Sequence, residues 1–251
     1  MLTADQTFTA EELARRPRVA KPVRGISSEG VRVFRRGPAT VTASPASPAL
    51  VEDLIEGPEL AVDGYFDAAG TPVILGILTH DFADDEDVAD TVYRTSRAVV
   101  RAHRDACAGV LAALNRHLGL RNFPFHYEPR VDPRRGPVSI ELNPLRFAGY
   151  GTCEIGWWAF GMDPYRHFIE ATAPNWDGIL AGDGDEADFA VVAIARGRDD
   201  LHAIATSFPQ ILEARPIADP KAACAALVLV REPDPARRQS YSAAWRTDSG
   251  A

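Results

Sequence analysis

The sequence is poor in the residues that build disulfide frameworks and membrane spans. Three cysteines, Cys107, Cys153 and Cys224, are too few and too scattered for a disulfide framework or a thiolate zinc site. No run approaches the ~20 apolar residues that cross a membrane, and the first residues lack a signal peptide's charged start and apolar stretch. We therefore expect a reduced, cytoplasmic chain that contacts no membrane.

Basic charge is also in short supply. The chain has 27 lysines and arginines against 35 aspartates and glutamates, which gives a net charge of −8 and argues against a surface for nucleic acid or anionic lipid. A hydrophobic share of 46% and a charged share of 25% are ordinary for a globular protein and exclude wholesale disorder. The length of 251 residues is enough for one or two domains.

Hydrophobic patterning predicts an α+β fold with mostly antiparallel hairpins. A short helix should begin after Thr9, with Glu12 in capping-box position, and end before Pro17. The other expected elements are strands over 18–23 and 31–34, a loop over 38–48, a hairpin over 61–79, a long helix over 95–118, a strand pair over 123–131 and 138–142, and a strand–helix–strand unit over 189–195, 201–214 and 225–232.

The first group of candidate functional residues is a lysine followed by a loop of small residues. Lys21 lies in an expected strand, and the loop after it carries Gly25, Ser27, Ser28 and Gly30. Glycines let backbone N–H groups approach an anion and a lysine adds a point charge, so this segment is able to bind phosphate. The spacing is not that of a Walker A loop, and an ordinary β-hairpin turn explains the same residues.

The second group combines a short strand with a Gly-Pro turn and an acid beyond it. The strand contains Glu52, Asp53, Leu54 and Ile55, and the acid is Glu59. Extended backbone can hydrogen-bond the edge of an adenine, and the two oxygens of a carboxylate can accept from both hydroxyls of a ribose. Solvated acids beside a turn are the alternative.

The third group lies on the expected strand pair before residue 145. If the strands pair, Glu128 and Glu141 come close together, with Asn143 on the same face as Glu141 because strand side chains alternate. Two carboxylates and an amide oxygen form the hard ligand set that Mg²⁺ prefers. Arg146, just beyond, can neutralise charge on a transferred phosphoryl group. Acids on an exposed hairpin are the alternative.

In this order and spacing the three groups resemble the ATP-grasp superfamily, the carboxylate–amine and carboxylate–thiol ligases that include D-alanine–D-alanine ligase and biotin carboxylase. The resemblance covers roughly residues 18–150. Lys21 and its loop resemble the family's second nucleotide lysine and flexible phosphate loop. Residues 52–55 resemble the hinge that grips adenine, with Asp53 where a lysine commonly stands, and Glu59 matches the ribose-binding acid.

The metal-site motifs make the resemblance specific. Glu128, Glu141 and Asn143 match the metal ligands of the family's E/D…ExN pattern, and Arg146 matches the arginine that many members carry shortly after the asparagine. The resemblance therefore implies ATP and Mg²⁺ as cofactors, with Mn²⁺ as a substitute, and Lys21 and Arg146 as catalytic residues.

The resemblance also implies an ATP-grasp fold of the α+β class, in which two lobes with mostly antiparallel sheets bind the nucleotide. We expect residues 1–50 to form part of the first lobe, 51–182 to form the second lobe with hinge and metal site, and 183–251 to form a small α/β appendage with a polar tail. The implied activity is a Mg²⁺-dependent ligation. A small carboxylate substrate is phosphorylated by ATP, and an amine or thiol then displaces phosphate from the acylphosphate.

Departures from the family pattern leave alternatives open. The Lys-Pro segment begins at residue 21, so we expect the usual N-terminal domain and earlier lysine to be lacking. The alternative function is a truncated module that binds nucleotide or a partner without ligating, while a homodimer or a separately encoded N-terminal chain are candidate partners. His126 stands near the expected phosphates or is structural. The acidic run over 81–90 reads as a solvated loop, because EF-hand spacing is missing.

Overall fold

The computed structural model describes residues 1–25, 28, 30–82, 92–149, 151–182, 189–195, 204, 206–208, 210–216, 226–231, 234 and 236. Ser27 and residues 83–90, on which two of the sequence predictions fall, lie outside the described residues. The chain forms two compact units: Met1–Glu56 with Phe82, and the described residues of Gly57–Asp81 and Thr91–Ala251. Both units combine helix with antiparallel sheet, so the predicted α+β class is confirmed.

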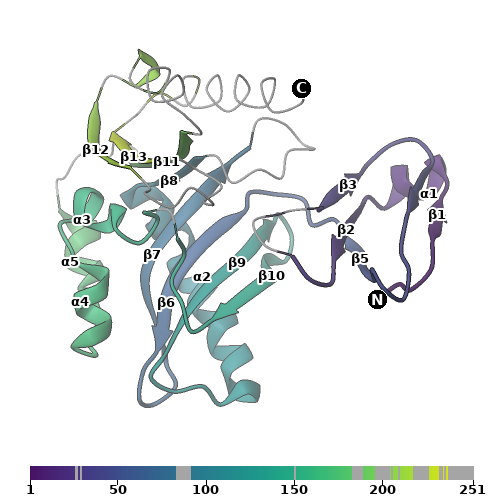
Figure 1. Ribbon diagram of the computed structural model, residues 1–251. Helices are drawn as coiled ribbons and strands as arrows, with labels where there is room; N and C mark the ends of the chain where they lie inside the picture. Colours follow the sequence, from purple (N-terminus) through teal and green to yellow (C-terminus); the bar gives the residue numbers. More distant parts are fainter. Residues whose placement is uncertain are drawn as a thin grey trace. The chain divides into compact units, whose positions relative to one another are not determined.

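The first unit is built from short strands (Figure 1) and has a small core of its own. Its elements are β1 Gln6–Phe8, α1 Ala10–Arg15, β2 Arg18–Pro22, β3 Arg32–Phe34, β4 Ala39–Val41 and β5 Ala49–Asp53. Strand β2 pairs antiparallel with β3 on one side and with β5 on the other. Helix α1 begins at the predicted capping box, in which Thr9 and Glu12 each accept a hydrogen bond from the other's backbone N–H. Its Leu13 is fully buried in this core.

The loop predicted over 38–48 contains a strand, which corrects the sequence prediction. β4 pairs antiparallel with β1, and Val41 is buried beside Phe8 and Leu13. Three residues carry too little periodicity to be recognised as a strand. The pairing depends instead on a partner strand far away in the sequence.

The second unit contains one eight-stranded antiparallel sheet in the order β10–β9–β6–β7–β8–β11–β13–β12. Its strands are β6 Leu60–Phe66, β7 Pro72–Asp81, β8 Val92–Thr95, β9 Phe123–Asp132, β10 Gly136–Pro144, β11 Phe189–Ala195, β12 Ile211–Pro216 and β13 Ala226–Arg231. Its helices are α2 Arg97–Leu118, α3 Ile155–Phe160, α4 Pro164–Ile169 and α5 Trp176–Ala181. The predicted long helix, central hairpin and following strand pair are confirmed. None of the helices in the described part of the chain is both long and apolar enough to span a membrane.

Helix α2 covers one face of strands β6, β7 and β9 (Figure 1). It begins after Ser96, whose hydroxyl accepts from the Val99 N–H, and ends at Gly119 in the left-handed conformation. Its buried side chains pack against alternate residues of the three strands. The shared core includes Val62, Ile77, Val100, Cys107, Leu111, Phe125 and Tyr127. Because strand side chains alternate, the residues between these core positions point to the opposite face.

The helix predicted over 201–214 is wrong at its C-terminal end. Ile211–Pro216 forms β12, which pairs antiparallel with β13. The sequence has a proline at 209, and a proline inside a helix removes a hydrogen bond and clashes with the preceding turn. The spacing of apolar residues is compatible with a helix on both sides of this proline, so it did not show that the residues after the proline form a strand.

Candidate functional site

The sheet face opposite α2 carries a group of polar and charged side chains. On β9, Phe125 and Tyr127 point into the core with α2. Alternation then sends His126, Glu128 and Arg130 to the other face. The same strand therefore supplies core packing on one side and chemistry on the other.

Strand register gathers further polar residues around those of β9. His126 lies opposite Asp63 of β6 and Asn143 of β10, and Glu128 lies opposite Glu141 of β10. Residues directly opposite in an antiparallel pair have Cβ atoms about 5 Å apart. These five residues from three strands are called the acid–histidine patch below.

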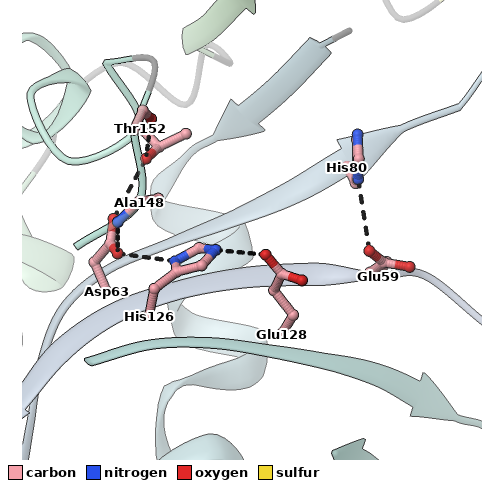
Figure 2. Close-up of polar contacts among 8 residues, drawn as sticks. Glu59, Asp63, His80, His126, Glu128, Ala148 and Thr152 are labelled. Atoms are coloured by element: carbon pink, nitrogen blue, oxygen red, sulfur yellow. Dashed lines mark hydrogen bonds and ion pairs between the residues drawn. The ribbon is translucent and has the colours of Figure 1, made fainter. Parts of the chain in front are cut away.

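A hydrogen-bonded chain runs through the patch (Figure 2). The Nδ1 atom of His126 lies 2.9 Å from Asp63 Oδ1, and its Nε2 atom lies 2.7 Å from Glu128 Oε1. Burial lowers the pKa of His126, but hydrogen bonds and charge from Asp63 and Glu128 outweigh it and raise the pKa to about 9. Since ionised carboxylates only accept, an imidazolium with both nitrogens protonated satisfies both contacts.

Asp63 also holds the segment that follows β10. Its Oδ1 atom accepts from the backbone N–H of Ala148 at 2.8 Å, and Oδ2 lies 3.4 Å from the Thr152 hydroxyl, which donates to it (Figure 2). Asp63 is completely buried. A buried carboxylate is stable only when its oxygens have partners, and here β9 and the segment after β10 supply them.

Glu59 lies beside Arg130 of β9, on the sheet face opposite α2. Its Oε2 atom accepts from Arg130 Nε at 2.8 Å. Its Oε1 atom lies 3.7 Å from His80 Nδ1 (Figure 2). Burial raises the pKa of Glu59, but the hydrogen bond and charge of His80, followed by the charge of Arg130, lower it to about 2. The His80 ring stacks on Tyr93, with centroids 4.3 Å apart. Glu59 is thus an ionised acid held between two strands, with 18% of its side chain exposed.

A glycine turn positions Glu59. Gly57 has a φ of 114°, and a Cβ atom at this position would lie 2.1 Å from the Val131 carbonyl oxygen. The Pro58 carbonyl accepts from the Val131 N–H at 2.9 Å. The turn therefore lies directly on the backbone of β9, where Glu59 pairs with Arg130 as an isolated bridge.

The residues predicted to bind metal meet within the acid–histidine patch. Glu128 and Glu141 are direct cross-strand neighbours. The Nδ2 atom of Asn143 is buried without a hydrogen-bond partner among the described residues, and a buried amide donor is costly unless an acceptor, such as a phosphate oxygen, pairs with it. Two carboxylates and an amide fit a hard cation such as Mg²⁺, which takes its other oxygen ligands from water and phosphate.

The candidate set has only two carboxylates. Across the described residues, no cluster of three or more His, Cys, Asp or Glu side chains is arranged to hold a metal ion. A cation at Glu128 and Glu141 would therefore depend on Asn143 and on ligands from outside the chain. That dependence is typical of Mg²⁺ bound together with a nucleotide.

In the first unit, Lys21 lies beside another predicted site residue. Its Nζ atom is 2.8 Å from Glu52 Oε2, and the two residues come from the paired strands β2 and β5. The loop after β2 includes Gly25, Ser28 and Gly30, and the last two have positive φ values of 57° and 74°. This part of the loop has turn geometry.

The predicted adenine hinge also lies in the first unit, at the end of β5. Asp53 forms ion pairs with Arg16 and Arg18. The Leu54 N–H donates to the Pro17 carbonyl at 2.9 Å, so this backbone donor is already used within the unit. Ile55 is half-buried just beyond.

Arg146 lies after β10, in the second unit. It is exposed and follows Leu145, which has a positive φ of 60° and whose N–H donates to the Pro124 carbonyl at 3.0 Å. Gly149 and Ala148 come next, where Asp63 holds the backbone. The segment that carries Arg146 is thus anchored at both ends.

Sequence reasoning missed several residues of this face: Asp63, His80, Arg130 and Thr152. Asp63 did carry a signal, because an acid in a strand whose neighbours are all apolar or aromatic must be buried with partners. His80 and Arg130 carried no signal in the sequence that marked them as site residues. Their contacts to Glu59 arise from the register of three strands, which no local pattern reveals.

Comparison with protein families matches residues 37–154 to an ATP-grasp domain. Among solved structures, an L-amino acid ligase from Bacillus licheniformis aligns with a TM-score of 0.58 and 16% identity, over 98% of this chain and 66% of that one. An N5-carboxyaminoimidazole synthetase from Staphylococcus aureus complexed with ADP gives 0.55 and 10%, over 99% and 68%. The biotin carboxylase domain of 2-oxoglutarate carboxylase from Hydrogenobacter thermophilus, in complex with MgADP, gives 0.53 and 14%, over 89% and 55%.

No curated protein matches the sequence. The chain spans 66% of the length of the L-amino acid ligase and 55% of the biotin carboxylase domain. Identities of 10–16% establish a shared fold and leave the substrate open. The family match over residues 37–154 and the shared fold agree with the resemblance that the motifs predict: this segment is similar to an ATP-grasp domain, and the chain shares the ATP-grasp fold.

Proposed function

We propose that the chain binds ATP together with Mg²⁺ and ligates a small carboxylate to an amine or a thiol. The observation that carries this proposal is the meeting of Glu128, Glu141 and Asn143 on one sheet face within an ATP-grasp domain. These oxygen donors are the kind that Mg²⁺ uses when it binds nucleotide phosphates. Proteins that share the fold include a ligase and a synthetase complexed with ADP, which supports the proposal.

Lys21 is proposed to contact the phosphates, with backbone N–H groups of the loop that holds Gly25, Ser27, Ser28 and Gly30. To do so, Lys21 exchanges Glu52 for a phosphate oxygen. The side chains of this ion pair are 21% and 41% exposed. Pairs of this kind contribute about 0–1 kcal/mol, so the exchange costs little.

Adenine and ribose are assigned to the segment from Glu52 to Glu59. The backbone of Asp53, Leu54 and Ile55 is proposed to meet the adenine edge. Glu59 is proposed to accept from the ribose hydroxyls. A carboxylate offers about four lone-pair sites, so contacts to Arg130 and His80 leave acceptor capacity on Glu59.

The proposed reaction has two displacement steps. An oxygen of the substrate carboxylate attacks the γ-phosphorus and ADP leaves, which forms an acylphosphate. The amine or thiol then attacks the acyl carbon and inorganic phosphate leaves. Arg146 would stabilise charge on the transferred phosphoryl group, and bound Mg²⁺ would neutralise charge on the phosphate oxygens. The chain contributes positioning and charge rather than a covalent intermediate.

Calorimetry tests the metal assignment. ADP is titrated into the protein with and without Mg²⁺, and the same is done with Glu141→Ala. The variant should lose the increase in affinity that Mg²⁺ brings, whereas Glu170→Ala, which removes an exposed acid that pairs with Arg166 on α4, should keep it. An unchanged Mg²⁺ effect in Glu141→Ala would show that Glu141 is not a ligand.

Phosphate release tests the ligase activity itself. The protein is incubated with ATP, Mg²⁺ and mixtures of amino acids, and inorganic phosphate is measured over time. Release that requires the mixture supports ligation. Mg²⁺-dependent ADP binding without any release would instead support a module that binds nucleotide and does not ligate.

A further inference from the structure

We infer that His126 is a positioning residue that holds the Glu128 carboxylate in the orientation in which it serves as a ligand. The inference rests on the proposed function for the ligand role of Glu128. It adds a residue that the motifs did not assign and names the atom through which that residue acts, the Nε2 of its ring.

The ring of His126 is fixed from both sides. Asp63 Oδ1 lies 2.9 Å from Nδ1, and Glu128 Oε1 lies 2.7 Å from Nε2 (Figure 2). The His126 side chain is 4% exposed and that of Asp63 is 1% exposed, whereas Glu128 is 25% exposed. The contact with His126 fixes Oε1, and the remaining lone-pair sites of the Glu128 carboxylate are left for a ligand.

Asp63, at the other end of this series of hydrogen bonds, is itself held by the backbone. Asp63 accepts from the Ala148 N–H at 2.8 Å, in the segment that follows Asn143 and Arg146. The same carboxylate therefore contacts both that segment and the His126 ring that faces Glu128. Glu128, a predicted ligand on β9, is thus connected by hydrogen bonds to the segment that follows β10, the strand that carries Glu141 and Asn143.

Stability alone is a poor explanation for this group of charges. Three ionisable side chains meet here, and two of them, Asp63 and His126, are almost completely buried. Burying ions costs several kcal/mol each, and apolar residues of similar volume often replace buried ion pairs without loss of stability. Orienting a ligand explains the charges better, since partners of a metal ligand commonly fix its geometry, and their loss costs about 10–100-fold in metal affinity.

Two substitutions of His126 separate the two ring nitrogens. The side-chain nitrogen of Gln lies near the place of Nε2, so His126→Gln keeps a donor to Glu128. The shorter His126→Asn keeps a donor to Asp63 and loses the one to Glu128. Affinity for ADP is measured by calorimetry with and without Mg²⁺, and the unfolding midpoint of each variant is recorded.

We expect the Mg²⁺-dependent gain in ADP affinity to fall about 10-fold or more in His126→Asn and to be largely kept in His126→Gln. Tyr127→Phe is the matched control, because it removes a hydroxyl contact to Ser139 from the neighbouring position on the core face. It should leave the Mg²⁺ effect intact. A purely structural histidine would lower the unfolding midpoint in both His126 variants and leave the Mg²⁺ effect of the folded protein unchanged, which would overturn the inference. Equal losses of the Mg²⁺ effect in both variants would also overturn it.

Glu128→Gln distinguishes this inference from the proposed function. If it abolishes the Mg²⁺ effect while His126→Asn does not, the inference alone fails. If Glu128→Gln leaves the Mg²⁺ effect intact, the metal assignment fails and the inference fails with it. Should the His126 variants not fold, Asp63→Asn keeps the ring and removes the charge that orients it. An unchanged Mg²⁺ effect in Asp63→Asn would then contradict the inference, and a loss would support it.

Discussion

Charged residues on the sheet face opposite α2 are held in place by pairs of partners. Glu59 lies between Arg130 and His80, and His126 lies between Asp63 and Glu128. Glu59 and His126 are mostly buried, and opposite charges and hydrogen bonds outweigh the cost that burial places on their charged forms. Removing one partner leaves the other charge buried and uncompensated, so single substitutions here should cost more than those at exposed ion pairs.

Glu59 should make the free energy of unfolding depend on pH. Its pKa is about 2 in the folded chain against an ordinary value of 4.5. A depressed folded pKa contributes stability that is present above the unfolded value and is lost as the pH falls through the folded value. We expect about 2 kcal/mol of unfolding free energy to be lost between pH 6 and pH 3 through this group. Urea unfolding at both pH values measures it.

Glu59→Gln should show a smaller loss over the same pH range, because the amide does not titrate. Glu11→Gln is the control, since Glu11 forms an exposed ion pair with Arg15 on α1. If wild type and Glu59→Gln lose the same free energy between the two pH values, the depressed pKa of Glu59 is wrong.

At the scale of elements, the registers of β6, β9 and β10 and the turn before β6 arrange the side chains on the face opposite α2. Gly57 lets the chain lie directly on β9 just before β6 begins. The register of β6 on β9 then sets Asp63 against His126, and the register of β10 on β9 sets Glu141 against Glu128. A shift of one residue would turn every one of these side chains to the core face.

Gly57→Ala should therefore destabilise the second unit. A φ of 114° is strained for a residue with a side chain, and the added Cβ atom would meet the Val131 carbonyl oxygen at 2.1 Å. We expect a loss of more than ~2 kcal/mol of unfolding free energy. Gly136→Ala is the control, because Gly136 also has a positive φ, of 75°, with open space around it, and it should lose only about 1 kcal/mol. Equal losses in urea unfolding would contradict the close-approach explanation.

At the scale of the whole molecule, the eight-stranded sheet unites strands that lie far apart in the sequence. β8 pairs with β7 on one side and with β11 on the other. The strands β11, β13 and β12 therefore extend the same sheet as the acid–histidine patch. Binding of a ligand to folded residues of this sheet should stabilise it against unfolding.

Thermal unfolding tests the proposed nucleotide binding on the intact chain. ADP at about 100 times its dissociation constant should raise the unfolding free energy by about 2.7 kcal/mol, and adding Mg²⁺ should raise the midpoint beyond the value with ADP alone. Mg²⁺ without nucleotide is the matched control and should change the midpoint little, since the chain supplies only part of the ligand set. An unfolding midpoint that ADP does not change in the presence of Mg²⁺ would contradict the proposal.

Local signals in the sequence were enough to predict the elements that depend on neighbouring residues. The capping box of Thr9 and Glu12, the long helix α2 and the central hairpin all follow from spacing within a few turns or strands. The strand β4 and the end of the 201–214 helix were mispredicted, because their conformations depend on β1 and β13. The ATP-grasp resemblance was predictable because its motifs are short and ordered along the chain.

The sequence by itself determined which residues are candidates for the chemistry: the acids, the asparagine and the basic residues stand at spacings that resemble the family's and need no structure to recognise. Only the tertiary structure decided which of them meet. The contacts of Asp63 with His126 and of Glu59 with Arg130 join positions more than sixty residues apart. Cross-strand neighbours are set by register and by the packing of the opposite face against α2, and these are properties of the assembled sheet that no single segment contains.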